Sequence, residues 1–224
     1  MKILAIDTAT EVCSVAIFED NNVLTQKTLN SVNTHSVELM PLIDIALREC
    51  NLNLNDIDLF SCDIGPGSFT GIRIGISTIK AFCDSINKPC IGISSLEAFA
   101  YSSIPPEQYV ICSLLNANHS NVYYGLFENS NNKLKQVEDY SFDSIENVLS
   151  HLNNLEKNIF FVGNCGILFH DMIKSHCKCS FEISSINSIS ATYIAKAAFS
   201  KFDNINLSNN ILSPLYLKKS SAES

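Results

Sequence analysis

Two short segments of the chain carry residues of the kind that bind phosphate groups. Asp7 ends an apolar run, residues 2–7, and Thr8 follows it, so the backbone N–H groups of a tight turn could hold a phosphate beside a carboxylate that attracts a metal. The second segment is Gly65-Pro66-Gly67-Ser68-Phe69-Thr70-Gly71, between a buried run and a helical one. The candidate residues of a degenerate nucleotide site are Asp7, Thr8, Gly65 and Gly67.

Both segments also have a purely structural interpretation. Asp7 is suited to an Asx turn, and no Lys follows the last glycine as a Walker loop would require. Pro66 removes one N–H from any phosphate cradle, whereas the glycines permit the positive φ of a tight strand-to-helix passage. Ser68 or Thr70 could then cap the helix that follows.

No catalytic or metal-ligating set is predicted. The group His176-Cys177-Lys178-Cys179, with His170 upstream, lacks the paired spacing of a structural zinc site. His35 and His119 have no partner at helical spacing, and no nucleophile and base can be paired from their order alone.

The elements that position these residues occur in an order that repeats. Strands are expected at residues 2–7, 12–18 and 23–29, a helix at 35–50, a strand at 58–64, a helix at 70–86 and a strand at 90–93. Pro41 must either kink the helix at 35–50 or lie in its first turn. After Pro105-Pro106, strands follow at 109–115, 122–128 and 133–140, then a helix at 143–155 and a strand at 158–162. This strand leads into the loop Gly163-Asn164-Cys165-Gly166 and then into a further helix. The repetition predicts a duplicated α/β architecture with lobes 1–104 and 105–224, in which a helix at about 190–202 can pack back on the first lobe.

Composition limits the function classes. Acidic residues outnumber basic ones 23 to 15, which gives a net charge of −8 and argues against direct tight binding of nucleic acid. Nine cysteines, with Cys13, Cys62, Cys90 and Cys112 in apolar runs, predict free buried thiols and a reducing compartment. Neither a signal peptide nor a membrane span is recognised, so a cytoplasmic location is expected.

Two helices of the first lobe have more apolar surface than one core-facing stripe needs. Helix 70–86 has a second face of small residues, which includes Gly71, Gly75 and Thr78, and helix 35–50 has Val37 and Met40 away from its main apolar stripe. Such a surplus indicates a protein interface at these five positions. The alternative is that the other lobe or the last helix covers it.

Several segments together resemble the TsaB (YeaZ) family of tRNA threonylcarbamoyladenosine biosynthesis proteins. They are Ile3-Leu4-Ala5-Ile6-Asp7-Thr8-Ala9-Thr10, the residues from His35 to Ile43, Gly65 to Gly71 running into Ile72-Arg73-Ile74-Gly75, and Ser94-Ser95-Leu96-Glu97-Ala98. The resemblance continues more weakly to Pro214-Leu215-Tyr216-Leu217-Lys218. Where the family usually has Asp-Ala-Arg, this chain has Asn116-Ala117-Asn118, so no site is assigned there.

The resemblance implies the duplicated actin-like ATPase fold of actin, hexokinase and Hsp70, with a mixed sheet flanked by helices in each lobe. It implies a non-catalytic subunit that pairs through the two helices of the first lobe with the related transferase TsaD, works with the ATPase TsaE, and forms a homodimer when alone. The modified adenosine lies beside the tRNA anticodon, and this chain would meet tRNA only indirectly. No cofactor is required, with weak binding of ATP or ADP the only candidate.

Two hypotheses in which the chain is an enzyme are alternatives to the role of a non-catalytic subunit. The chain could be an actin-fold ATP-binding kinase or hydrolase that uses Asp7 and the Gly65 loop on its own. The second alternative is a peptidase, which would need a metal to activate water. Metal-dependent relatives carry a His-x-x-x-His pair on the early helix, whereas here the residues four positions before and after His35 are Ser31 and Leu39, so the pair is missing.

Overall fold

The computed structural model describes residues 1–30, 34–131, 133–202 and 212–217. By their contacts the residues form two compact units: Met1–Ala98 with Ile189–Leu215, and Phe99–Ser188 with Tyr216–Ser224. The sequence placed the boundary at Pro105, whereas the contacts place it inside a short helix, α3 (Ser95–Ser102), and return a later segment to the first unit. None of the described helices is both long enough and apolar enough to cross a membrane.

Unit 1 is built on a five-stranded mixed sheet. Its order is β3 (Asn22–Asn30), β2 (Val12–Glu19), β1 (Lys2–Asp7), β4 (Leu59–Asp63) and β5 (Cys90–Ile93). β1, β2 and β3 form an antiparallel meander, and β4 and β5 add to it in parallel. β1, β2 and β4 are buried on both faces, which explains why their sequences are almost continuously apolar.

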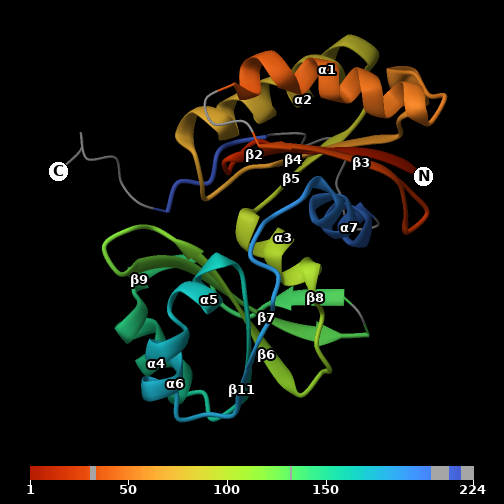
Figure 1. Ribbon diagram of the computed structural model, residues 1–224. Helices are drawn as coiled ribbons and strands as arrows, with labels where there is room; N and C mark the ends of the chain where they lie inside the picture. The colour runs from red at the N-terminus through yellow and green to blue at the C-terminus, as the bar shows by residue number, and fades with distance from the viewer. Residues whose placement is uncertain (31–33, 132, 203–211, 218–224) are drawn as a thin grey trace. The chain divides into compact units, whose positions relative to one another are not determined.

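Helices α1 (His35–Glu49) and α2 (Phe69–Ile86) cover one face of this sheet (Figure 1). Leu4 and Ile6 of β1 pack there against a cluster that includes Leu39 of α1 and Ile79 of α2. Pro41 lies within α1 without ending it. A single 3₁₀ turn, η1 (Leu54–Asp56), precedes β4.

Helix α7 (Ala191–Lys201) lies on the opposite face of the same sheet (Figure 1). Ala5 and Ala16 are cross-strand neighbours there and are fully buried, and α7 likewise buries mainly alanines. Small side chains on both surfaces let the helix approach the strands closely. The helix is also held at both ends, because Ser14 Oγ accepts from Ala191 N at 2.7 Å and Lys201 Nζ lies 2.6 Å from a Glu97 carboxylate oxygen.

Unit 2 repeats the arrangement with a second mixed sheet. The order is β11 (Phe181–Ile183), β10 (Asn158–Val162), β6 (Tyr109–Asn116), β7 (Asn121–Ser130) and β8 (Lys133–Gln136), and β9 (Ser141–Ser144) pairs with the other end of β7. Its helices are α4 (Ile145–Asn153), α5 (Asn164–Leu168) and α6 (His170–His176). The order of the sheet mirrors that of unit 1, and Gly65 and Gly163, at equivalent places after β4 and β10, share a φ of 102°. The predicted duplication is confirmed.

Two expectations for unit 2 were wrong in detail, and one strand was not predicted. Of the strand expected at 133–140 only residues 133–136 form a strand, β8, and a separate strand, β9, follows at 141–144, where the start of a helix was expected. β8 and β9 pair with opposite ends of β7. The helix after Gly163 is interrupted at Phe169, and β11 was not predicted. A three-residue strand is too short to show periodicity in the sequence.

Candidate functional site

The glycine stretch rests directly on the hairpin that follows β1. Ser68 N donates to the Ala9 carbonyl at 2.7 Å, and the Thr8 hydroxyl donates to the Gly71 carbonyl at 2.7 Å. A Cβ on Gly67 would lie 2.4 Å from the Ala9 carbonyl oxygen. The structure therefore brings the predicted residues together, and the glycines serve the contact between the two loops.

Several of the polar groups predicted to bind a phosphate or its metal already form hydrogen bonds within the chain. Asp7 and Thr8 are almost fully buried, and Ala9 N donates to Asp7 Oδ1 at 2.9 Å in the predicted Asx turn. Gly65 N donates to Asp63 Oδ1 at 2.7 Å. Ser68 caps α2, as one of the two predicted alternatives, with its hydroxyl accepting from Gly71 N at 3.2 Å. These bonds favour the structural interpretation of the stretch, and nucleotide binding stays a prediction.

A second buried carboxylate, which the sequence did not single out, lies beside Asp7. β1 and β4 are parallel with Ile6 opposite Cys62, so Asp7 and Asp63, the next residue on each strand, are neighbours on one face. Both strands end in Asp, but only the register of the sheet shows that the two meet. Ser95, at the start of α3, donates to Asp63, while Ser94 caps that helix by accepting from Glu97 N.

Burial dominates the electrostatics of this pair. Loss of water raises the pKa of the Asp7 carboxyl to about 7, and the N–H of Ala9 opposes that rise only in part. The pKa of Asp63 is raised well above its usual range by burial and then by the charge of Asp7. Asp7 Oδ2 is buried with no hydrogen-bond partner. Perturbed carboxyls of this kind occur at functional sites and at structural ones alike.

The outer face of α1 presents apolar side chains to solvent. Val37 is 73% exposed, and Met40 and Ile45 are each 50% exposed. On the neighbouring α2, Phe69 is 52% exposed and the Arg73 guanidinium lies 3.8 Å from the centre of its ring. Val37 and Met40, three positions apart, are neighbours on the surface of α1, and Ile45 lies farther round the helix. These three exposed side chains are here called the α1 face.

Two residues predicted for the partner interface lie elsewhere. Gly71 and Gly75 are buried, and a Cβ on Gly75 would lie 2.6 Å from Thr8 Oγ1. Thr78 is half-buried, and its hydroxyl donates to the Ile74 carbonyl. Gly71 and Gly75 therefore face the β1 hairpin, and of the five predicted residues only Val37 and Met40 are well exposed.

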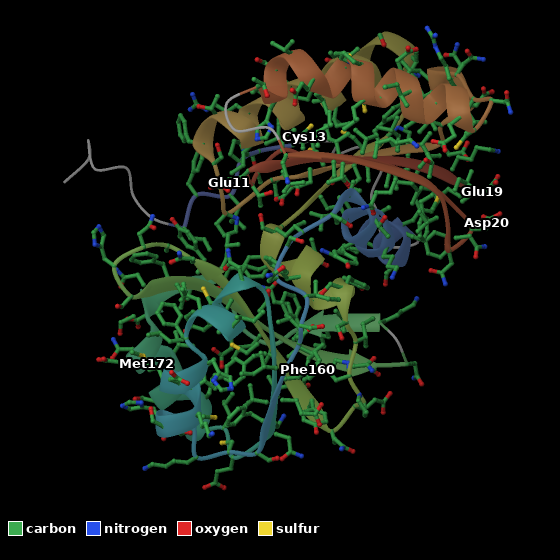
Figure 2. The ribbon with its side chains drawn as sticks, in the orientation of Figure 1. Glu11, Cys13, Glu19, Asp20, Phe160 and Met172 are labelled. Carbon is green, nitrogen blue, oxygen red and sulfur yellow. The ribbon has the colours of Figure 1, made fainter. Side chains whose placement is uncertain are left out.

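Figure 2 helps to locate the other candidate residues. Glu11 and Cys13 mark the hairpin end of β2, and Glu19 and Asp20 mark its other end.

Cys13, Cys62, Cys90 and Cys112 are buried as predicted, and every described cysteine is a free thiol. In unit 2, Met172 marks α6, which contains His170 and His176. Within the described ranges no three His, Cys, Asp or Glu side chains converge as metal ligands.

The hairpin at Asn116 and Asn118 repeats the Asp7 turn without its charge. Asn118 N donates to Asn116 Oδ1 at 2.9 Å, as Ala9 N does to Asp7. Asn116 N in turn donates to Asn164 Oδ1 at the start of α5. The second unit therefore has an Asx turn at the equivalent strand end.

Comparison with known proteins identifies the family. The family model for TsaD, tRNA N6-adenosine threonylcarbamoyltransferase, matches residues 22–221. The tRNA threonylcarbamoyladenosine biosynthesis protein TsaB of Bacillus subtilis is 29% identical over 78% of this chain and 76% of its own length. TsaB of Buchnera aphidicola is 30% identical over 72% of this chain and 78% of its own length.

Among solved structures, YeaZ from Pseudomonas aeruginosa superposes with a TM-score of 0.79, covers 96% of this chain and 99% of its own, and is 21% identical. That likeness shows the fold, and the two mixed sheets are those of the actin-like ATPases. The sequence matches go further: the chain belongs to the TsaB (YeaZ) family and takes part in the biosynthesis of threonylcarbamoyladenosine in tRNA.

Proposed function

We propose that this chain is a non-catalytic subunit that binds a TsaD-like threonylcarbamoyltransferase through the α1 face and so supports the modification of adenosine beside the anticodon. The observation that carries the proposal is the exposure of Val37, Met40 and Ile45 on a helix whose opposite side is fully packed. A partner that removed these side chains from water would gain on the order of 1 kcal/mol or more from each.

The composition of the surface suits a specific interface. Phe69 and Arg73 combine an aromatic ring and a guanidinium, two of the side-chain types that contribute most to binding energy. Asp44 and Arg48 form an ion pair on the outer side of α1, both largely exposed, and such charges steer and orient a partner. The outer side of α1 therefore combines exposed apolar side chains with an ion pair.

The internal bonds of the loops support a role without catalysis. Thr8, Ser68 and the N–H groups of Gly65 and Ala9 bind other parts of unit 1. The partner would supply the reacting groups. We extend the proposal to a TsaE-like ATPase as a further member of the assembly, to a homodimer when the chain is alone, and to tRNA contact only through the partners.

One observation keeps the ATP-binding alternative in view. Asp7 Oδ2 is buried at a strand end without a hydrogen-bond partner, and an unpaired carboxylate oxygen beside a tight turn could hold a metal next to a nucleotide phosphate. Calorimetric titration of the isolated chain with ATP and a phosphate-release assay decide this point. ATP turnover that disappears in an Asp7→Ala variant would establish that the chain is an ATP-dependent enzyme.

Co-purification with the cognate TsaD-like protein tests the proposal itself. Met40→Glu should reduce capture of that protein and formation of the modified nucleoside. Leu168→Glu is the matched control, because Leu168 is an apolar residue of unit 2 with 57% exposure. If the Met40→Glu variant still captured the TsaD-like protein fully while the Leu168→Glu variant lost it, the interface would lie on unit 2 and not on α1. Gly75→Glu is unsuitable, because the new side chain would collide with Thr8.

A further inference from the structure

The hydroxyl of Ser95 lies within hydrogen-bonding distance of more acceptors than it can serve. Its Oγ is 2.7 Å from Asp63 Oδ1, 2.8 Å from Asp63 Oδ2 and 2.8 Å from the carbonyl oxygen of Pro66. A hydroxyl has one proton to donate. With an ionised Asp63, either the carboxylate or the Pro66 carbonyl would face Ser95 with no proton between the oxygens, in a buried site where an unmade bond is costly.

One additional proton would place a hydrogen between Ser95 Oγ and each of its two neighbouring groups, the Asp63 carboxyl and the Pro66 carbonyl. We propose that Asp63 is protonated in the folded chain, that its Oδ2 donates to Ser95 Oγ, and that Ser95 in turn donates to the Pro66 carbonyl oxygen. Asp63 Oδ1 then accepts only the N–H of Gly65, at 2.7 Å. The relay ties the end of β4 and the start of α3 to the glycine stretch.

The electrostatic surroundings favour that proton. Asp63 is 1% exposed and Asp7 is fully buried beside it, and two carboxylates in one buried site do not both ionise readily. Burial and the Asp7 charge raise the pKa of Asp63 well above its ordinary value. The titratable or charged groups of the packed elements are Asp7 of β1, Cys13 of β2, Cys62 of β4, Cys90 of β5, Glu38 of α1, Lys80 of α2, and Glu97 of α3 with its partner Lys201 of α7. Across the described residues, no basic side chain forms an ion pair with Asp7 or Asp63.

The consequence is a pH-sensitive attachment of the glycine stretch. A carboxyl whose pKa is higher in the folded than in the unfolded chain stabilises the fold below the unfolded pKa, and that stability is lost as the pH rises through the folded pKa. Since the stretch leads into α2, deprotonation of Asp63 as the pH rises through its folded pKa would loosen the start of that helix. This inference is independent of the partner-binding proposal.

Urea unfolding of the full chain between pH 5 and pH 8 tests the relay with the variant Asp63→Asn. The amide keeps an acceptor for Gly65 N and supplies a permanent donor to Ser95. The folding equilibrium constant of the wild type should fall by up to about tenfold per pH unit for each proton that the folded chain retains. Asp63→Asn should have a pH dependence weaker by one proton and should be the more stable protein at pH 8. Asp84→Asn, at an exposed carboxyl of α2, should keep the wild-type pH dependence.

Lower stability of Asp63→Asn than of the wild type at pH 8, with an unchanged pH dependence, would overturn the proposal. Carbon-13 NMR of the native protein, labelled at the Asp carboxyl carbons, gives a second measurement. A protonated carboxyl signal at pH 7 that persists in Asp7→Asn supports the relay. Absence of such a signal from the wild-type protein contradicts the relay, even where Asp63→Asn does not fold. A gain in wild-type stability with millimolar Mg²⁺ would also contradict the relay, because it would show an ionised pair that binds a cation.

Discussion

Thr8 and Gly71 lie so close that only glycine fits at position 71. The Thr8 hydroxyl donates to the Gly71 carbonyl oxygen at 2.7 Å, and a Cβ on residue 71 would lie 1.8 Å from the Thr8 carbonyl oxygen. The first turn of α2 therefore rests on the β1 hairpin itself. This contact gives the glycine stretch a physical role that does not depend on a bound phosphate.

Gly71→Ala should destabilise unit 1 by about 2–3 kcal/mol or more, because the new methyl group must push the hairpin and α2 apart. Chemical unfolding followed by circular dichroism measures the change. Ser77→Ala, at an exposed position of the same helix, should stay within about 0.5 kcal/mol of the wild type. Equal stability of the two variants would show that the contact is not as tight as described.

Lys201→Met should destabilise the packing of α7 by about 1–3 kcal/mol, since it leaves the carboxylate of Glu97 buried without its partner. The loss is smaller than for a fully enclosed pair because 43% of the Lys201 side chain is exposed. Burial raises the pKa of Glu97 and Lys201 lowers it, so removal of Lys201 raises it further. The deficit should therefore grow as the pH rises from 5 to 8.

The double variant Lys201→Met, Glu97→Gln is the control for that ion pair. Replacing the buried charge by an amide should restore part of the stability at pH 8 and remove the additional pH dependence. If the single variant loses the same stability at both pH values, the loss comes from packing alone.

Val37→Ala and Ile45→Ala should each weaken binding of the TsaD-like partner by about fivefold to tenfold, because truncation of a buried apolar contact costs about 1 kcal/mol or more. Both residues are at least half exposed in the isolated chain, so the free energy of unfolding should change by less than about 0.5 kcal/mol. Surface plasmon resonance and thermal melts give the two quantities. Leu168→Ala should leave the affinity unchanged, and a loss as large as that of Val37→Ala would point to unit 2 instead.

Alkylation of the native protein should follow the burial of its cysteines. Cys13 and Cys112 are fully buried, and burial raises the pKa of the Cys13 thiol to about 11. Cys50 and Cys177 are only half-buried, so brief treatment with iodoacetamide should modify them first. Peptide mass spectrometry after increasing times of treatment measures the order in which the cysteines are modified. Early labelling of Cys112 in folded protein would mean that the core of unit 2 opens more readily than its packing suggests.

The sequence alone determined the order of most elements and the family. Strands such as 2–7 and 158–162 are short apolar runs between turn residues, and Ser68 precedes an amphipathic stretch, so their local pattern was sufficient. The duplication was also readable, because two strands each lead into a glycine loop and a helix.

Tertiary structure decided which surfaces those elements cover. Periodicity showed that Gly71 and Gly75 share a face of α2, but not that the β1 hairpin occupies it. The meeting of Asp7 with Asp63 depends on the register of two strands far apart in sequence, and the attachment of α7 depends on Ser14 and Glu97 from other elements. Local sequence determines which side chains point the same way, whereas their neighbours are set by long-range packing.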